Sequence, residues 1–232
     1  MKKLVVLFLA VTSLVSARGF LFWGDENESK GEIIAQQQAS NQRWERIKEL
    51  EKRISFDRDK TRLERNYKEY KKEFDLYMEE LKSSPEQLFN IGDYYFKDGR
   101  YEKAYEVFSK DDTNIKNVFG AATTAKFLNN NEVALNLYSQ AISMDPNFYE
   151  SYLGRGIINR NIGNYNEAIN DLKKYMEYKK DESAYMGLGE LYMLTNNYAE
   201  AKNILEIGRN RYPHSVVIKD MLIRTYAELK NN

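Results

Sequence analysis

Cysteine is absent from this 232-residue sequence, histidine occurs once, and proline occurs three times. The lack of cysteine excludes disulfides, thiolate metal sites, thiol catalysis and acylation of an N-terminal cysteine. The single histidine, His214, has no second histidine or cysteine with which to complete a metal ligand set. Neither sign of charge predominates, because 35 basic residues are balanced by 35 acidic ones, and this argues against a protein that coats nucleic acid electrostatically.

Residue patterns that carry catalysis are also missing. Acidic pairs such as Asp111-Asp112 fall at expected helix ends, where solvated carboxylates lack the shifted pKa values that paired acid–base catalysis requires. The Gly-Arg-Gly stretch at 154–156 follows no strand pattern and precedes no Lys-Ser/Thr pair, so it is not a phosphate-binding loop. We therefore predict a protein that is not an enzyme and uses no cofactor and no metal.

The N-terminal residues 1–17, MKKLVVLFLAVTSLVSA, are typical of a secretory signal peptide. Two lysines precede a short apolar stretch, and small or compact residues lead to a cleavage site after Ala17. An uncleaved anchor extended through residues 20–23 is the alternative, although a charged residue and a glycine interrupt that run. Cleavage predicts an exported protein without a stable membrane span. We expect it in the periplasm, with secretion or surface exposure left open, and expect residues 18–32 to form a flexible linker.

Residues 33–82 are densely charged and, from 33 to 81, contain no proline or glycine, which is typical of a long solvent-exposed helix. Apolar residues in two halves of the segment follow heptad spacing, but the two registers differ by one residue. We therefore expect one long helix or coiled coil with a stutter or break near 55–62. A helix of this kind needs a partner, so homo-oligomerisation and docking on the following domain both stay open.

The C-terminal two thirds of the sequence repeats itself at intervals of 30, 34 and 33 residues. The repeated alanines are Ala104, Ala134, Ala168 and Ala201. A glycine lies twelve residues before three of these alanines, and a tyrosine lies three residues before the same three. A period near 34 with this pattern resembles the tetratricopeptide (TPR) repeat.

The TPR resemblance implies an all-α solenoid of about four helix-turn-helix repeats, preceded by the long charged helix. We assign residues 84–232 to this domain, with a capping helix at 216–229. The first repeat is expected to be short, because Asp111-Asp112-Thr113 ends its second helix early. The four expected repeats cover residues 84–112, 115–148, 149–181 and 182–214.

In TPR proteins the first helix of each repeat lines a concave groove, and the family geometry places fixed repeat positions on it. The matching positions here are mixed in chemistry but rich in apolar side chains, which favours an adaptable protein or peptide ligand such as a helix. The partner-binding residues expected from the resemblance are Phe89, Phe96, Phe119, Lys126, Leu153, Ile157, Arg160, Met186 and Met193.

The order of signal peptide, coiled coil and TPR domain resembles periplasmic proteins of the CpoB/YbgF type, which coordinate cell-wall synthesis with outer-membrane constriction. The sequence is rich in Lys, Asn, Ile and Tyr, which suggests an AT-rich bacterial genome. The resemblance implies a protein-binding scaffold of the bacterial cell envelope. Two alternatives stay open: a secreted or surface-exposed adhesin that uses the long helix, and an accessory activator of a cell-wall enzyme complex.

Overall fold

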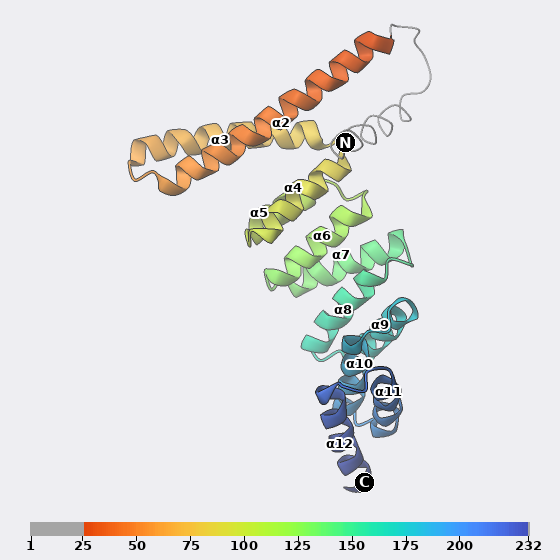
Figure 1. The fold of residues 1–232 in the computed structure, drawn as a ribbon. Helices are drawn as coiled ribbons and strands as arrows, with labels where there is room; N and C mark the ends of the chain where they lie inside the picture. The colour runs from red at the N-terminus through yellow and green to blue at the C-terminus, as the bar shows by residue number, and fades with distance from the viewer. Residues whose placement is uncertain (1–25, 232) are drawn as a thin grey trace. The chain divides into compact units, whose positions relative to one another are not determined.

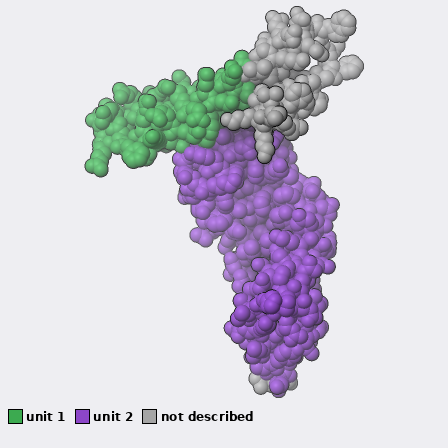
Figure 2. All heavy atoms as spheres, viewed as in Figure 1, with its two compact units in different colours: residues 1–77 green, residues 78–232 purple. Residues whose placement is uncertain are grey.

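The computed structural model describes residues 26–231, and every element in that part of the chain is a helix (Figure 1). The predicted all-α class is therefore confirmed. The predicted signal peptide lies outside the described residues. Two compact units make up the chain, residues 1–77 and residues 78–232, with the boundary inside the second described helix (Figure 2).

Among the described residues of the first unit, from 26 onward, two helices take the place of the one long helix expected over residues 33–82. The first, α2, runs from Glu26 to Phe56 and so includes residues 26–32, which the sequence analysis assigned to a linker. Helix α3 runs from Lys60 to Leu81. The break between them falls within the segment where a stutter or break was expected.

Two aspartates build the turn between α2 and α3. The backbone N–H of Asp59 donates to the Asp57 carboxylate at 3.0 Å, and the backbone N–H of Arg62 donates to the Asp59 carboxylate at 2.8 Å. The second bond satisfies an amide in the first turn of α3 that has no partner within the helix. The local chemistry of two short acidic side chains thus ends one helix and starts the next.

Helix α2 folds back along α3, so the two form a hairpin. Trp44 stacks on Tyr77 with ring centroids 5.8 Å apart, and Arg43 pairs with Glu73 at 2.8 Å. A second ion pair joins Arg46 to Glu69. The buried residues at the predicted heptad positions are Ile47, Leu50, Phe74, Tyr77 and Leu81.

Four helix pairs and a closing helix form the second unit, and Figure 1 shows each pair following the previous one along the chain. Each pair lies inside one of the four residue ranges expected for a repeat. The helices are α4 (Pro85–Lys97), α5 (Tyr101–Phe108), α6 (Ile115–Phe127), α7 (Asn131–Met144), α8 (Tyr149–Asn161), α9 (Tyr165–Tyr178), α10 (Glu182–Leu194), α11 (Tyr198–Arg211) and α12 (Val216–Asn231).

The two helices of each pair are joined by the same turn. One residue in each turn has a positive φ, namely Gly99 (74°), Asn129 (58°), Gly163 (86°) or Asn196 (57°). Glycine and asparagine are the residues that tolerate this left-handed conformation after a helix. The amide that follows donates back to a carbonyl five residues earlier, as in Asn164 to Asn159 at 2.8 Å, which closes the helix end.

Small residues let the helices of a pair approach closely. The four repeated alanines are completely buried, at 0% exposure each. In the last pair, a Cβ on Gly189 of α10 would lie 2.6 Å from Leu205 of α11. A larger side chain at such a position would push the pair apart or displace a buried leucine.

The first repeat is short, as predicted, because α5 has 8 residues whereas α7, α9 and α11 have 14. After the short α5, a set of hydrogen bonds centred on Asp111, here called the Asp111 network, holds the chain. The buried Asn117 side chain donates to Asp111 at 3.0 Å and to the Pro85 carbonyl at 3.0 Å, and Thr113 donates to Asp111 through its hydroxyl and its amide. Burial raises the pKa of Asp111, but these donors outweigh it and leave the pKa below its ordinary value.

Serines precede two of the helices, and only one of the two caps its helix through the side chain. Ser215 accepts a hydrogen bond from the Ile218 amide at 3.2 Å and caps the closing helix. Ser84 precedes Pro85 but makes no capping bond through its side chain. The closing helix buries Leu222 but exposes Val216 and Ile223.

The Asp111 network predicts that the free energy of unfolding depends on pH. Because the carboxylate has a lower pKa in the folded chain than in the unfolded chain, it stabilises the fold at neutral pH, and that contribution is lost as pH falls through the folded-state pKa, below 3.8. Asp111→Asn should lower the free energy of unfolding by about 1–3 kcal/mol at pH 7. Urea titrations at several pH values should show this difference shrinking below about pH 4. A difference that is constant with pH would contradict the assignment.

The hairpin predicts which cysteines can be joined within one chain. Arg46→Cys with Glu69→Cys places the only two thiols where an ion pair now joins the helices. We expect a short bis-maleimide reagent to link the two thiols within one chain, seen as faster migration on a denaturing gel, because the ion pair shows that side chains at these two positions reach each other. A direct disulfide would need the two Cα atoms within about 7 Å. The control pair, Arg46→Cys with Lys68→Cys, should cross-link poorly, since residue 68 points about 100° away from residue 69 on the helix. Dimers cross-linked through the first pair would instead indicate a swapped or coiled-coil oligomer.

Candidate functional site

All nine residues predicted to bind a partner lie on the first helices of the four pairs. Their placement follows from the repeat period, because one whole repeat separates each first helix from the next. Helix α4 carries Phe89 and Phe96, α6 carries Phe119 and Lys126, α8 carries Leu153, Ile157 and Arg160, and α10 carries Met186 and Met193.

The nine side chains differ in how much surface they offer. None of them is fully buried, and Ile157, at 36% exposure, is the most accessible of the apolar members. Phe119, Leu153 and Met186 pack partly against the buried core clusters of the repeats. These three therefore combine a structural role with whatever surface they present, whereas Ile157 has more of its side chain available to a ligand.

An aromatic cluster lies at the end of the first helices in repeats one and two. The rings of Phe96, Tyr101 and Phe127 are within 5.0–5.3 Å of one another, and Phe127 remains 48% exposed. The sequence analysis identified Phe96 but missed Phe127, which directly follows the predicted Lys126. The signal that could have found it is its position as the last residue of the helix, adjacent to the turn.

Lys126 is the one basic groove candidate with a perturbed environment. Its ammonium lies 5.2 Å from the centre of the Phe127 ring, in the range of a cation–π contact. Burial lowers its pKa below the ordinary value for lysine. A cation that has already lost part of its water binds a ligand carboxylate at a smaller further desolvation cost.

Arg160 of α8 bridges to the next repeat. Its guanidinium pairs with Glu190 of α10 at 2.6 Å, and the two side chains are 40% and 42% exposed. A pair this accessible contributes little stability, because water and salt screen it. Each of the two side chains can therefore leave its partner and pair with a ligand group of opposite charge at a modest cost in free energy.

A buried polar network that the sequence analysis missed holds α8 in place. Two guanidinium nitrogens of Arg155 donate hydrogen bonds to the Asp171 carboxylate of α9. The third donates to the Ser139 hydroxyl of α7, and all these distances are 2.7–3.3 Å. Asn159 of α8 also donates to Asp171, which is nearly buried. The hydrogen bonds to Asp171 raise the pKa of Arg155, which keeps the guanidinium charged.

This network orients the groove face of α8. Arg155 and Asn159 lie on the side of the helix that meets α7 and α9, so Ile157 and Arg160 project from another side. The Gly-Arg-Gly stretch at 154–156 thus has a structural role. A Cβ on Gly156 would lie 3.1 Å from the Asp171 Cβ, so its small size helps the arginine and aspartate to meet.

No group of three or more metal-ligating side chains is found among the described residues. His214, the only histidine in the sequence, is exposed in the turn before α12. No helix in the described part of the chain is both long and apolar enough to cross a bilayer.

Comparison with known proteins identifies the repeats. Models of the tetratricopeptide repeat match residues 87–110, 137–170 and 163–228. A TPR repeat-containing protein of Methanocaldococcus jannaschii is 32% identical over 128 residues, which cover 53% of this chain and 22% of that protein. The chain spans only 10%, 21% and 22% of the lengths of the curated relatives it matches.

Solved structures show the same architecture at low sequence identity. A crystal structure of MamA matches with a TM-score of 0.53 and 21% identity, and the match covers 64% of this chain and 94% of that chain. YrrB, described as a TPR protein with an unusual peptide-binding site, matches with a TM-score of 0.54 and 19% identity, over 66% of this chain and 81% of that chain. Together with the family models, these matches show that the chain carries tetratricopeptide repeats in an all-helical fold.

Proposed function

We propose that this chain is a non-enzymatic protein-interaction scaffold of the bacterial cell envelope, which binds a protein or peptide partner along the first helices of its TPR domain. The observation that carries the proposal is the row of half-buried or exposed apolar side chains on α4, α6, α8 and α10. Repeats of this kind present their first helices as one continuous surface, which suits an extended or helical ligand. The partner-binding row comprises Phe89, Phe96, Phe119, Leu153, Ile157, Met186 and Met193.

The chemistry of the row suggests what kind of partner it accepts. Methionine and phenylalanine fill irregular apolar surfaces, so the ligand would present apolar anchors spaced along a helix or strand. Lys126 and Arg160 add positive charge at one end of their helices, which favours an acidic group beside those anchors. Asp93, at a position where some TPR domains carry a carboxylate-gripping side chain, is paired with Lys97, so a ligand held by its terminal carboxylate fits poorly.

The envelope location rests on the sequence of residues 1–17. Their lysine pair, apolar stretch and small residues before Ala17 support export. The absence of cysteine agrees with a protein that does not depend on the redox state of its compartment. A periplasmic scaffold is therefore the proposal that accounts for both the N-terminal pattern and the repeat surface.

The proposal predicts that charge on the partner-binding row abolishes capture of the partner. Ile157→Glu with Met193→Glu should weaken binding by about tenfold or more, because hot-spot truncations cost more than about 1 kcal/mol and a buried charge adds to this. Both side chains are accessible enough for the variant to fold, which circular dichroism would check. The measurement is cross-linking in intact cells followed by affinity purification and mass spectrometry.

A matched control separates the row from surface hydrophobicity in general. Ile207 lies on the second helix α11 and is 54% exposed, so Ile207→Glu makes the same chemical change away from the row. We expect this variant to capture the partner as the wild type does. Equal capture by a folded Ile157→Glu, Met193→Glu variant would refute the binding surface, and equal loss in the control would refute its location.

A further inference from the structure

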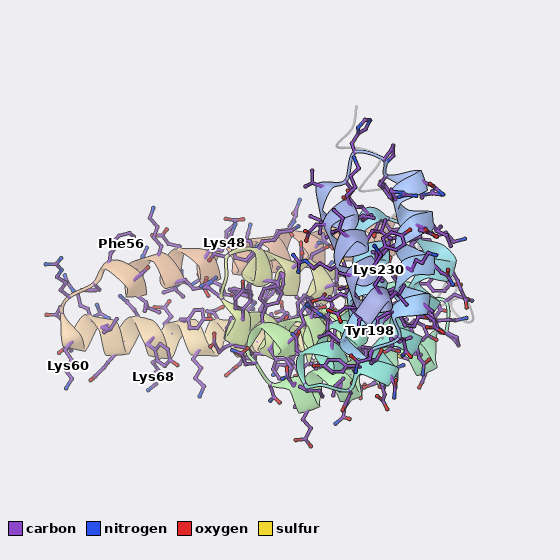
Figure 3. All side chains as sticks on the ribbon, turned by 90° about the horizontal axis from the view of Figure 1, so that it is seen from below. Lys48, Phe56, Lys60, Lys68, Tyr198 and Lys230 are labelled. Carbon is purple, nitrogen blue, oxygen red and sulfur yellow. The ribbon has the colours of Figure 1, made fainter. Side chains whose placement is uncertain are left out.

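The closed end of the α2–α3 hairpin concentrates positive charge. We call residues 52–68 the hairpin tip; it contains seven lysines and arginines and three acidic residues, in a chain whose total charges balance. Figure 3 shows Phe56 and Lys60 at this closed end, with Lys68 farther along α3. A local excess of one sign on a neutral chain creates a field that attracts an oppositely charged surface.

Most of this charge is not neutralised within the structure. Arg53 pairs with Glu49 and Arg62 pairs with Asp57. The two acidic residues of the turn are further occupied by backbone and side-chain donors. The tip cations that are exposed and form no ion pair within the described part of the chain are Lys52, Arg58, Lys60, Arg65 and Lys68.

An apolar aromatic side chain stands among these cations. Phe56, the last residue of α2, is 77% exposed. A single exposed hydrophobic residue is ordinary on a protein surface. A phenylalanine at the apex of a turn, with cations before and after it in the chain, is the combination that binds the headgroup region of an anionic bilayer.

We propose that the hairpin tip docks on a membrane surface that contains anionic phospholipid. Phe56 enters the boundary between headgroups and acyl chains, while Lys52, Arg58 and Lys60 contact lipid phosphates. Each cation near such a surface adds a favourable increment that falls off within a Debye length. This surface is separate in chemistry and in residues from the partner-binding row, so the proposal does not depend on the proposed function.

Lipid fits this end of the hairpin better than an acidic polymer does. A soluble polyanion would use the cations but would leave Phe56 in water, whereas a bilayer interface takes up both. The turn also places the aromatic side chain at the end of the hairpin, where a flat surface can reach it without contacting the rest of the two helices.

The test uses the full chain with a fluorescent reporter beside Phe56. Because the sequence has no cysteine, Ser55→Cys provides a single labelling site for an environment-sensitive NBD dye and leaves Phe56 intact. We expect the emission to rise and shift to the blue on vesicles of phosphatidylcholine with about one third phosphatidylglycerol, and to stay unchanged on pure phosphatidylcholine. Raised salt should reverse the change, because the attraction is screened.

Ser143→Cys is the matched control label. Ser143 and Ser55 are both exposed near the end of a helix, and each hydroxyl donates to the carbonyl four residues earlier at 2.9 Å. A dye at residue 143 should not respond to either vesicle. In the Ser55→Cys background, Phe56→Ala should reduce the depth-dependent blue shift, and Arg58→Glu with Lys60→Glu should weaken the apparent vesicle affinity by about tenfold or more.

Three results would overturn the proposal. The first is an unchanged dye at residue 55 on anionic vesicles. The second is an equal response at residue 143, which would mean that the chain adsorbs without using the tip. The third is a response to soluble double-stranded DNA or polyglutamate but not to vesicles, which would assign the tip to an acidic polymer. A response at residue 55 alone, lost in the charge-reversed variant, supports lipid docking even if other segments also bind the vesicles.

Discussion

Close crossing of the two helices in each repeat is the constraint on which the rest of the TPR unit depends. Each second helix has a completely buried alanine, and in the last repeat Leu205 of the second helix leaves no space for a Cβ on Gly189 of the first. Since every repeat packs only on its neighbours, a pair forced apart would change the relation of all the first helices that follow it. The left-handed turn repeated at four places keeps the two helices of each pair antiparallel.

Buried polar contacts then fix the orientation of helices that apolar packing alone would leave variable. The Arg155–Asp171 network joins α8 to α7 and α9 by hydrogen bonds. In the first repeat, where α5 is short, the Asp111 network holds the chain between α5 and α6. Each network includes a residue on a helix that carries part of the partner-binding row, Arg155 on α8 and Asn117 on α6, and rotation of either helix would change which side chains face a ligand. Buried polar groups that are hydrogen-bonded in this way specify one arrangement among several of similar apolar burial.

The chain presents two surfaces of different chemistry. The first helices of the repeats offer half-buried and exposed apolar side chains suited to a protein segment, and the hairpin tip offers exposed cations around an exposed phenylalanine. Apolar contact is short-ranged and depends on shape, whereas attraction between charge and a membrane acts over a Debye length and depends on salt. A scaffold with both could hold a partner near an anionic surface while the two interactions remain separately adjustable.

The sequence by itself determined the helices of the repeats and their order, because its small residues recur at a 30–34-residue period with the spacing typical of stacked TPR helix pairs. It also placed all nine predicted binding residues on first helices. Only the tertiary structure decided which of these are free: Leu153 and Met186 pack on core clusters, whereas Ile157 stays accessible. It also decided that α2 and α3 fold on each other and that Arg155 meets Asp171. Periodicity reports which face of a helix is apolar, but not which neighbour covers that face, since this depends on contacts between residues far apart in the chain.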